Sequence, residues 1–282
     1  MSVGPVMMGR MTNAALHDLA HDHLPAELAR HWIGQLRPAA HLRKAEAGDP
    51  VVGQLGGLPR LPADVAWPVW EGRGPLRFVA AVDCAALPTG ELDVPLPTEG
   101  QLAFFYYGDD DEDVDALVDT ADPDTWAGAR VLHLPPGSDD EPEHPAPAGL
   151  TPYPAVPLTA RIGPSAPDTE SPVLGGAELP DAFERALWDY ESGTAHQIGG
   201  HAQSVQGAVE IVVAHGALGG GVAWEDPRVE EEARRWVLLA QFDSDEDAGM
   251  MWGDEGVLYW LIRPEDLAAG RFDRAMFTWQ CG

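Results

Sequence analysis

Two segments far apart in the chain have nearly the same pattern of apolar residues. Leu76–Asp83 reads LRFVAAVD and Trp236–Asp243 reads WVLLAQFD. Farther along, GQLAFFYY at 100–107 aligns with GVLYWLIR at 256–263, and a Gly-Gly pair precedes each of the two copies. Because these landmarks recur in the same order, the pattern predicts an internal duplication.

Short apolar runs, separated by clusters of Gly, Pro and Asp, are typical of strands covered on both faces. Strands are predicted at Leu76–Val82, Gln101–Tyr107, Arg130–Leu134, Leu158–Ile162, Trp236–Phe242, Gly256–Ile262 and Phe272–Gln280. Since one copy is too small to form a core alone, we expect the two copies to pack against each other. The predicted fold class is α+β: a duplicated, mainly antiparallel β-sheet core with a pseudo-twofold internal repeat and short N-terminal helices.

Helical and linker signals divide the chain further. Leu16, Leu19, Ala20 and Leu24 recur at three- and four-residue steps, and Pro25 precedes Leu28 and Trp32, which predicts two short helices. A third helix is predicted to begin at Asp181, with Glu184 spaced as in a capping box. The predicted division is a flexible tail at 1–11, an N-terminal helical segment at 12–45, a first repeat half at 46–134, a Pro-rich connection at 135–157 and a second repeat half at 158–282, with 46–282 forming one compact domain.

The net charge of −29, from 46 acidic and 17 basic residues, restricts the partners of the chain. A polyanion repels phosphate groups, which excludes nucleic acid and anionic membranes and favours a cationic protein partner. Apolar runs such as Val257–Ile262 are far shorter than the roughly 20 residues of a membrane-spanning helix. Two cysteines and an opening segment unlike a signal peptide predict a cytoplasmic location. The sequence leaves the oligomeric state open.

Motifs in both halves resemble those of the YwqG-like family. They are GGLPRLP at 56–62, WP at 67–68, LRFVAAVD at 76–83, GQLAFFY at 100–106, HQIGG at 196–200, WVLLAQFDSD at 236–245, MWGD at 251–254 and RPEDL at 263–267. The resemblance covers about residues 50–280 and implies a bacterial α+β domain of unknown function. Its association with secreted-toxin loci implies an immunity or accessory role. The family usually has Gln before the strand-ending Asp in both copies, whereas here Ala81 stands where the second copy has Gln241.

Aromatic and polar residues beside Gly and Pro mark a candidate ligand site. Trp and Tyr are favoured anchors for ligands and protein partners, although burial in a core is the competing interpretation. The predicted site is a cleft between the copies, lined by Trp67, Trp70, His196, Gln241, Trp252 and Asp254. The predicted function is a non-enzymatic binding module for a protein partner, in the immunity or regulatory setting that the resemblance implies.

A calcium site is the main alternative. Asp243, Asp245 and Asp247 alternate as the ligands of a calcium loop do, but Ala248 stands where an EF-hand has Gly, and a solvated acidic turn is the simpler interpretation. No cofactor other than calcium is suggested. A hydrolase with two carboxylates has the least support, because the nucleophile elbow, the phosphate-binding loop and the dinucleotide fingerprint are missing from the sequence.

Overall fold

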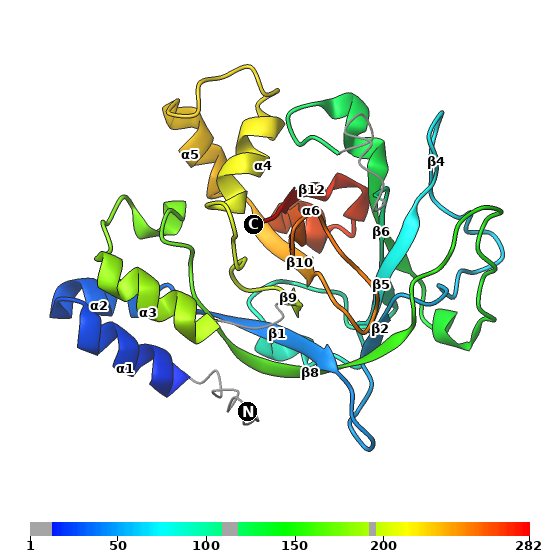
Figure 1. Ribbon diagram of the computed structural model, residues 1–282, viewed down its shortest axis with the longest axis horizontal. Helices are drawn as coiled ribbons and strands as arrows, with labels where there is room; N and C mark the ends of the chain where they lie inside the picture. The colour runs from blue at the N-terminus through cyan, green and yellow to red at the C-terminus, as the bar shows by residue number, and fades with distance from the viewer. Residues whose placement is uncertain (1–12, 109–117, 192–195) are drawn as a thin grey trace, which may run out of the picture.

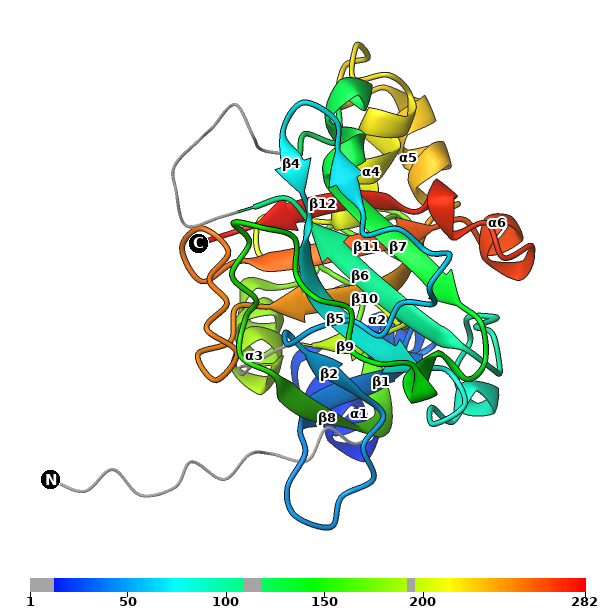
Figure 2. The same cartoon turned by 90° about the vertical axis from the view of Figure 1, so that its right-hand side faces the viewer.

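The computed structural model describes residues 13–108, 118–191 and 196–282, so the predicted tail at 1–11 lies outside the described residues. Ten strands form one strongly curved sheet in the order β12-β11-β10-β9-β1-β8-β2-β5-β6-β7, with every pair of neighbours antiparallel (Figures 1 and 2). These strands are β1 (Arg37–Lys44), β2 (Gly53–Leu55), β5 (Arg77–Asp83), β6 (Gln101–Tyr106), β7 (Ala129–Leu134), β8 (Val156–Ser165), β9 (Gln197–Ile198), β10 (Val237–Asp243), β11 (Val257–Ile262) and β12 (Met276–Gln280). A separate small sheet pairs β3 (Val69–Trp70) with β4 (Gly74–Pro75).

The helices occur throughout the described chain. They are α1 (Asn13–His23), α2 (Ala26–Ile33), α3 (Asp181–Glu191), α4 (Val209–Ala217), α5 (Pro227–Ala233) and α6 (Pro264–Ala268). The sequence predicted the first three, whose apolar residues form one cluster in which Trp32 meets Phe183 edge-on at 5.0 Å. Among the described residues, no helix has both the length and the apolar character needed to cross a membrane.

The predicted fold class is wrong. β1 pairs with β8 along its whole length, from Arg37 opposite Ser165 to Lys44 opposite Leu158, and this pairing joins all ten strands into one continuous sheet. The structure therefore has no duplicated core of two packed copies, and its helices are not confined to the amino end. The sequence RPAAHLRK of β1 escaped detection because it lacks the apolar runs by which the other strands were recognised.

The two similar apolar segments lie in two hairpins of this single sheet. β5 pairs with β6, with Asp83 opposite Gln101, and β10 pairs with β11, with Asp243 opposite Val257. Each hairpin has one irregularity in its register, between Phe78 and Ala80 in the first and between Leu238 and Ala240 in the second. The resemblance between the segments thus corresponds to a shared local pairing.

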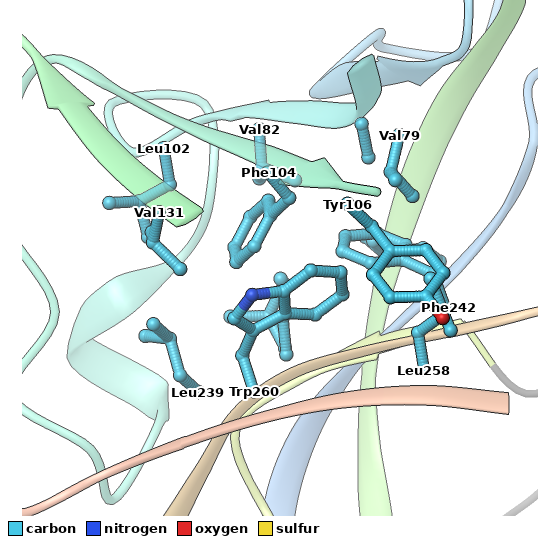
Figure 3. Close-up of a cluster of buried hydrophobic side chains, with 14 of the residues drawn as sticks. Val79, Val82, Leu102, Phe104, Tyr106, Val131, Leu239, Phe242, Leu258 and Trp260 are labelled. Atoms are coloured by element: carbon cyan, nitrogen blue, oxygen red, sulfur yellow. The ribbon is translucent and has the colours of Figure 1, made fainter. Parts of the chain in front are cut away.

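Aromatic side chains from both hairpins fill the inside of the curved sheet (Figure 3). Phe104 of β6 contacts Phe242 of β10 and Trp260 of β11, with ring centroids 5.0 and 5.3 Å apart. All three side chains are almost completely buried. Burial of each such ring contributes about 1.5–3 kcal/mol, and the mainly edge-to-face contacts add to this. The aromatic cluster therefore holds the two hairpins together.

α4 packs on the outer face of β11 and β12. Its Val209 and Val213 are fully buried against Leu238, Tyr259 and Leu261. α5 packs in turn against α4 through Val229 and Ala233. Neither helix was predicted, and the two together form the upper part of the molecule in Figure 1.

Candidate functional site

The tryptophans predicted to line a cleft are buried instead. Trp67 and Trp70 are each 8% exposed and Trp252 is 4% exposed. Trp67 packs edge-on against Phe105 and its Nε1–H donates to the carbonyl of Leu76. Trp70 and Trp252 belong to the main core cluster, whereas Trp67 belongs to another. The structure therefore does not bring the three rings together around an open space.

His196 is held at the start of the loop that follows β10. Its side chain is 2% exposed, and its Nδ1 accepts the backbone N–H of Asp243 at 3.0 Å. Because Nδ1 is an acceptor, Nε2 carries the proton and donates to Oδ2 of Asp245 at 3.2 Å. This hydrogen bond lowers the pKa of the Asp245 carboxyl. Both ring nitrogens are thus engaged in holding the loop.

The other polar residues predicted at the site, Gln241 and Asp254, differ in burial. Gln241 is completely buried, and its Oε1 accepts the backbone N–H of Gln203 at 2.9 Å. Asp254 is exposed at the surface, where its carbonyl accepts the N–H of Gly282. Gln241 therefore positions backbone, whereas the Asp254 side chain faces solvent.

Of the three aspartates predicted to bind calcium, Asp245 and Asp247 accept hydrogen bonds from other residues of the chain. Oδ2 of Asp247 accepts a hydrogen bond from Nζ of Lys44 at 2.8 Å, and Oδ1 of Asp245 accepts the N–H of Ala248 at 2.7 Å. Asp243 is half-buried. In residues 13–108, 118–191 and 196–282, no group of three or more His, Cys, Asp or Glu side chains is arranged to hold a metal ion.

A groove of about 320 Å³ opens between the segment after β8 and the start of α5. Residues 169–177 form one wall together with Ile211 of α4. Trp224 and Glu225, from the loop before α5, and Glu230 on α5 form the other wall. In Figure 1 the chain that leads from β8 to α3 passes below α4 and α5.

Trp224 is 54% exposed at this groove and is held in a fixed orientation. Its indole stacks on the imidazole of His215, with centroids 3.8 Å apart and planes 11° from parallel. His215 is itself buried, and its Nε2 is 2.9 Å from the carbonyl oxygen of Val222. Trp224 therefore presents a rigid flat ring to solvent.

The local sequence explains how Trp224 returns to His215. α4 ends at a reversal in which Gly219 and Gly220 have φ angles of +88° and +68°, a region that glycine occupies without strain. α5 then begins at Pro227, capped by Asp226, whose side chain accepts the N–H of Arg228. The loop between the two helices is thus fixed at both ends, by the glycine turn after α4 and by the Asp226 cap of α5.

The groove is acidic. Of the described residues that line it, four are acidic and none is basic: Glu170, Glu225, Asp226 and Glu230. Hydrogen bonds from Arg228 at 2.7 and 3.0 Å lower the pKa of Asp226 to about 2, and Arg234 pairs with Glu230. For Glu170 and Glu225, no ion pair is found within the described part of the chain, so the groove keeps an excess of negative charge.

Two further carboxyl groups belong to residues that adjoin the groove-lining residues in the sequence. Asp168 precedes the wall segment 169–177, and Glu210 precedes Ile211. Burial raises the pKa of both, that of Glu210 to about 7. Oε2 of Glu210 is buried and has no hydrogen-bond partner among the described residues. Neither carboxyl group lines the groove itself.

The groove was not predicted from the sequence. The signal that could have found it is the run Trp224-Glu-Asp-Pro227, where a helix-starting Asp-Pro pair places the preceding Trp and Glu in a surface loop. Residues 169–177 carry no comparable signal, because their part in the groove depends on packing between distant segments.

The fold and groove define a mainly antiparallel β protein with an acidic, aromatic-lined surface groove. The family model described as Domain of unknown function (DUF1963) matches residues 53–281, and the chain belongs to this family. The match includes the whole groove but not β1 or the first two helices. A search of curated proteins found no match.

Proposed function

We propose that this protein is a binding module that takes a cationic segment of a protein partner into the groove beside Trp224. The observation that carries the proposal is an exposed, fixed indole next to carboxylates that have no ion pair in the described part of the chain. The finer YwqG-like relationship, with its bacterial immunity or regulatory role, and a cytoplasmic location belong to the same proposal.

Charge and shape both support a basic segment as the ligand. The net charge of −29 attracts cations over a distance set by salt, about 8 Å at physiological ionic strength. Close to the surface, the carboxylates of Glu225 and Glu170 attract a cationic side chain, whereas Trp224 offers apolar area to its methylene groups. A groove of about 320 Å³ suits one or two side chains rather than a folded domain.

The test is titration of the protein with short basic and acidic peptides of equal length, followed by calorimetry at low and physiological salt. We expect the basic peptide to bind, more weakly as salt rises, and the acidic peptide not to bind. Trp224→Ala should weaken binding by about tenfold, since an aromatic anchor often contributes more than 1 kcal/mol. Trp188→Ala is the matched control, because Trp188 is 64% exposed on α3 and does not line the groove. Equal binding of both peptides, or identical effects of the two variants, would contradict the proposal.

A further inference from the structure

The exposed indole of Trp224, beside the groove carboxylates, favours one type of cationic side chain over another. We propose that the groove is selective for arginine over lysine: a guanidinium lies flat on Trp224 while a groove carboxylate accepts its N–H donors. This inference rests on the proposed function and specifies the side chain that the partner contributes.

The ring of Trp224 is held rigidly. Trp224 stacks on His215 at 3.8 Å, and His215 is fixed by burial and by its contact with the Val222 carbonyl. A planar, weakly hydrated guanidinium gains stacking area on a fixed flat ring, whereas an ammonium is a compact and strongly hydrated point charge. A rigid platform therefore favours arginine.

A tryptophan, a glutamate and an arginine already form such an arrangement elsewhere in the chain. Cζ of Arg263 lies 4.9 Å from the ring centroid of Trp236. The carboxylate of Glu232 accepts both the Nε1–H of Trp236, at 3.0 Å, and a hydrogen bond from Arg263. The groove has the Trp and the Glu of this arrangement, but none of its lining residues is basic.

The carboxylates of the groove can accept two hydrogen bonds from one guanidinium. Asp226, also in the groove, receives Nε and Nη2 of Arg228 on its two oxygens at 3.0 and 2.7 Å. This two-point contact is the geometry by which a carboxylate distinguishes a guanidinium from an ammonium. Glu225, the neighbouring residue, offers the same pair of oxygens to an external arginine.

The aromatic content of the groove argues against a methylated lysine. Sites for quaternary ammonium groups surround the cation with several aromatic rings. Among the residues that line this groove, Trp224 is the single aromatic one. One ring supports stacking on one side and does not enclose a cation.

The experiment compares four peptides of identical sequence that carry arginine, lysine, trimethyllysine or uncharged citrulline at the same positions. Binding is measured by calorimetry with the full chain. We expect the arginine peptide to bind about fivefold or more tightly than the lysine peptide, and the citrulline peptide to bind least. Trp224→Leu keeps apolar area but removes the flat ring, so it should bring the arginine and lysine affinities together. Glu225→Gln should weaken both charged peptides.

The outcomes separate this inference from the proposed function. Equal binding of the arginine and lysine peptides, both weakened by Trp224→Leu, would overturn arginine selectivity and leave the binding module intact. Tighter binding of the trimethyllysine peptide would overturn it as well. Selectivity that persists unchanged in Trp224→Leu would refute stacking on this ring. Failure of every peptide to bind would refute the proposed function itself. Thermal unfolding of each variant checks that it remains folded.

Discussion

The hairpins β5–β6 and β10–β11 have the same register but present different chemistry on their outer faces. In the first hairpin, Ala81 and Ala103 are small side chains that belong to an apolar cluster with Trp67. In the second hairpin, polar side chains occupy the same registered positions. The corresponding residues are Ala81, Ala103 and Leu134 on β5, β6 and β7, and Gln241, Tyr259 and Gln280 on β10, β11 and β12.

These polar side chains hold the loop that leads into α4. Gln241 and Gln280 accept backbone N–H groups of residues 203, 205 and 206 at 2.8–3.0 Å. The hydroxyl group of Tyr259 donates to the carbonyl of Gln203 at 2.8 Å. α4 then carries Ile211 and His215 to the groove. Strand pairing alone therefore does not place the groove. The polar side chains on the outer face of the second hairpin hold the loop that leads into α4, and the first hairpin has no such side chains at the corresponding positions.

The largest expected effect is the loss of a ring between the hairpins. Phe104→Ala and Trp260→Ala remove fully buried, mutually contacting rings, and each should cost about 3–5 kcal/mol of unfolding free energy. Urea unfolding followed by circular dichroism and fluorescence measures the loss, with exposed Val69→Ala as the control. Because the sheet is continuous, both signals should change in one transition. Two separate transitions would show that the hairpins unfold independently.

The next largest effect is expected from Glu210 of α4, whose carboxyl group makes the stability of the protein depend on pH. The pKa of Glu210 is raised by burial from its ordinary 4.5 to about 7, with Asp168 adding repulsion and Arg37 opposing it. Between these pH values the folded state binds more protons than the unfolded state, so this group lowers stability as pH rises. Glu210→Gln should therefore stabilise the protein at pH 8 by up to about 3 kcal/mol, and much less at pH 4.5.

Denaturant unfolding of Glu210→Gln and the unchanged protein at several pH values measures this difference. Exposed Glu225→Gln is the control, and its effect on stability should not grow over the same range. A difference between Glu210→Gln and the unchanged protein that stays constant with pH would contradict the burial of this carboxyl group.

A smaller effect is expected when the second hairpin is made like the first. Gln241→Ala installs the residue found at position 81 and leaves the N–H of Gln203 without its side-chain acceptor. We expect a loss of about 1–3 kcal/mol and faster hydrogen exchange at Gln203. Gln206→Ala is the control, because its backbone N–H still reaches Gln280. Unchanged exchange at Gln203 would mean that Gln241 does not hold the loop.

The smallest effect on stability is expected from the ion pair between Lys44 and Asp247, in the loop that follows β10. Lys44 and Asp247 form an exposed ion pair at 2.8 Å, of a kind that adds little to stability. Lys44→Gln should leave the thermal midpoint unchanged, whereas His196→Ala, which removes two buried contacts from the same loop, should lower it. A larger loss from Lys44→Gln than from His196→Ala would reverse this ranking.

The strands with apolar runs and the helices with clear spacing were predictable. All seven predicted strands are present with shifted ends, the last of them shortened to β12, and α1, α2 and α3 are present as well. β1, β2 and β9 were missed because one is polar and the others have two or three residues. The prediction of two packed copies failed because the partner of β1 is β8, and no local pattern shows this pairing.

The candidate site was less predictable than the fold. Trp252 and Trp67 were chosen because they stand beside Gly253 and Pro68, and Trp70 as a further counterpart in the first copy, and all three are buried. Trp224 also stands in a turn-rich stretch, yet it is exposed. A tryptophan suits a core and a ligand site equally well, so its residue type does not determine its burial.

By itself, the sequence determined the local structures and the charge of this protein, because strand and helix periodicity and ionisable groups act over a few residues. Only the tertiary structure decided that ten strands form one sheet and that segments near residues 170, 211 and 224 enclose a groove. The physical reason is that burial and hydrogen bonding between distant segments depend on the whole packed chain.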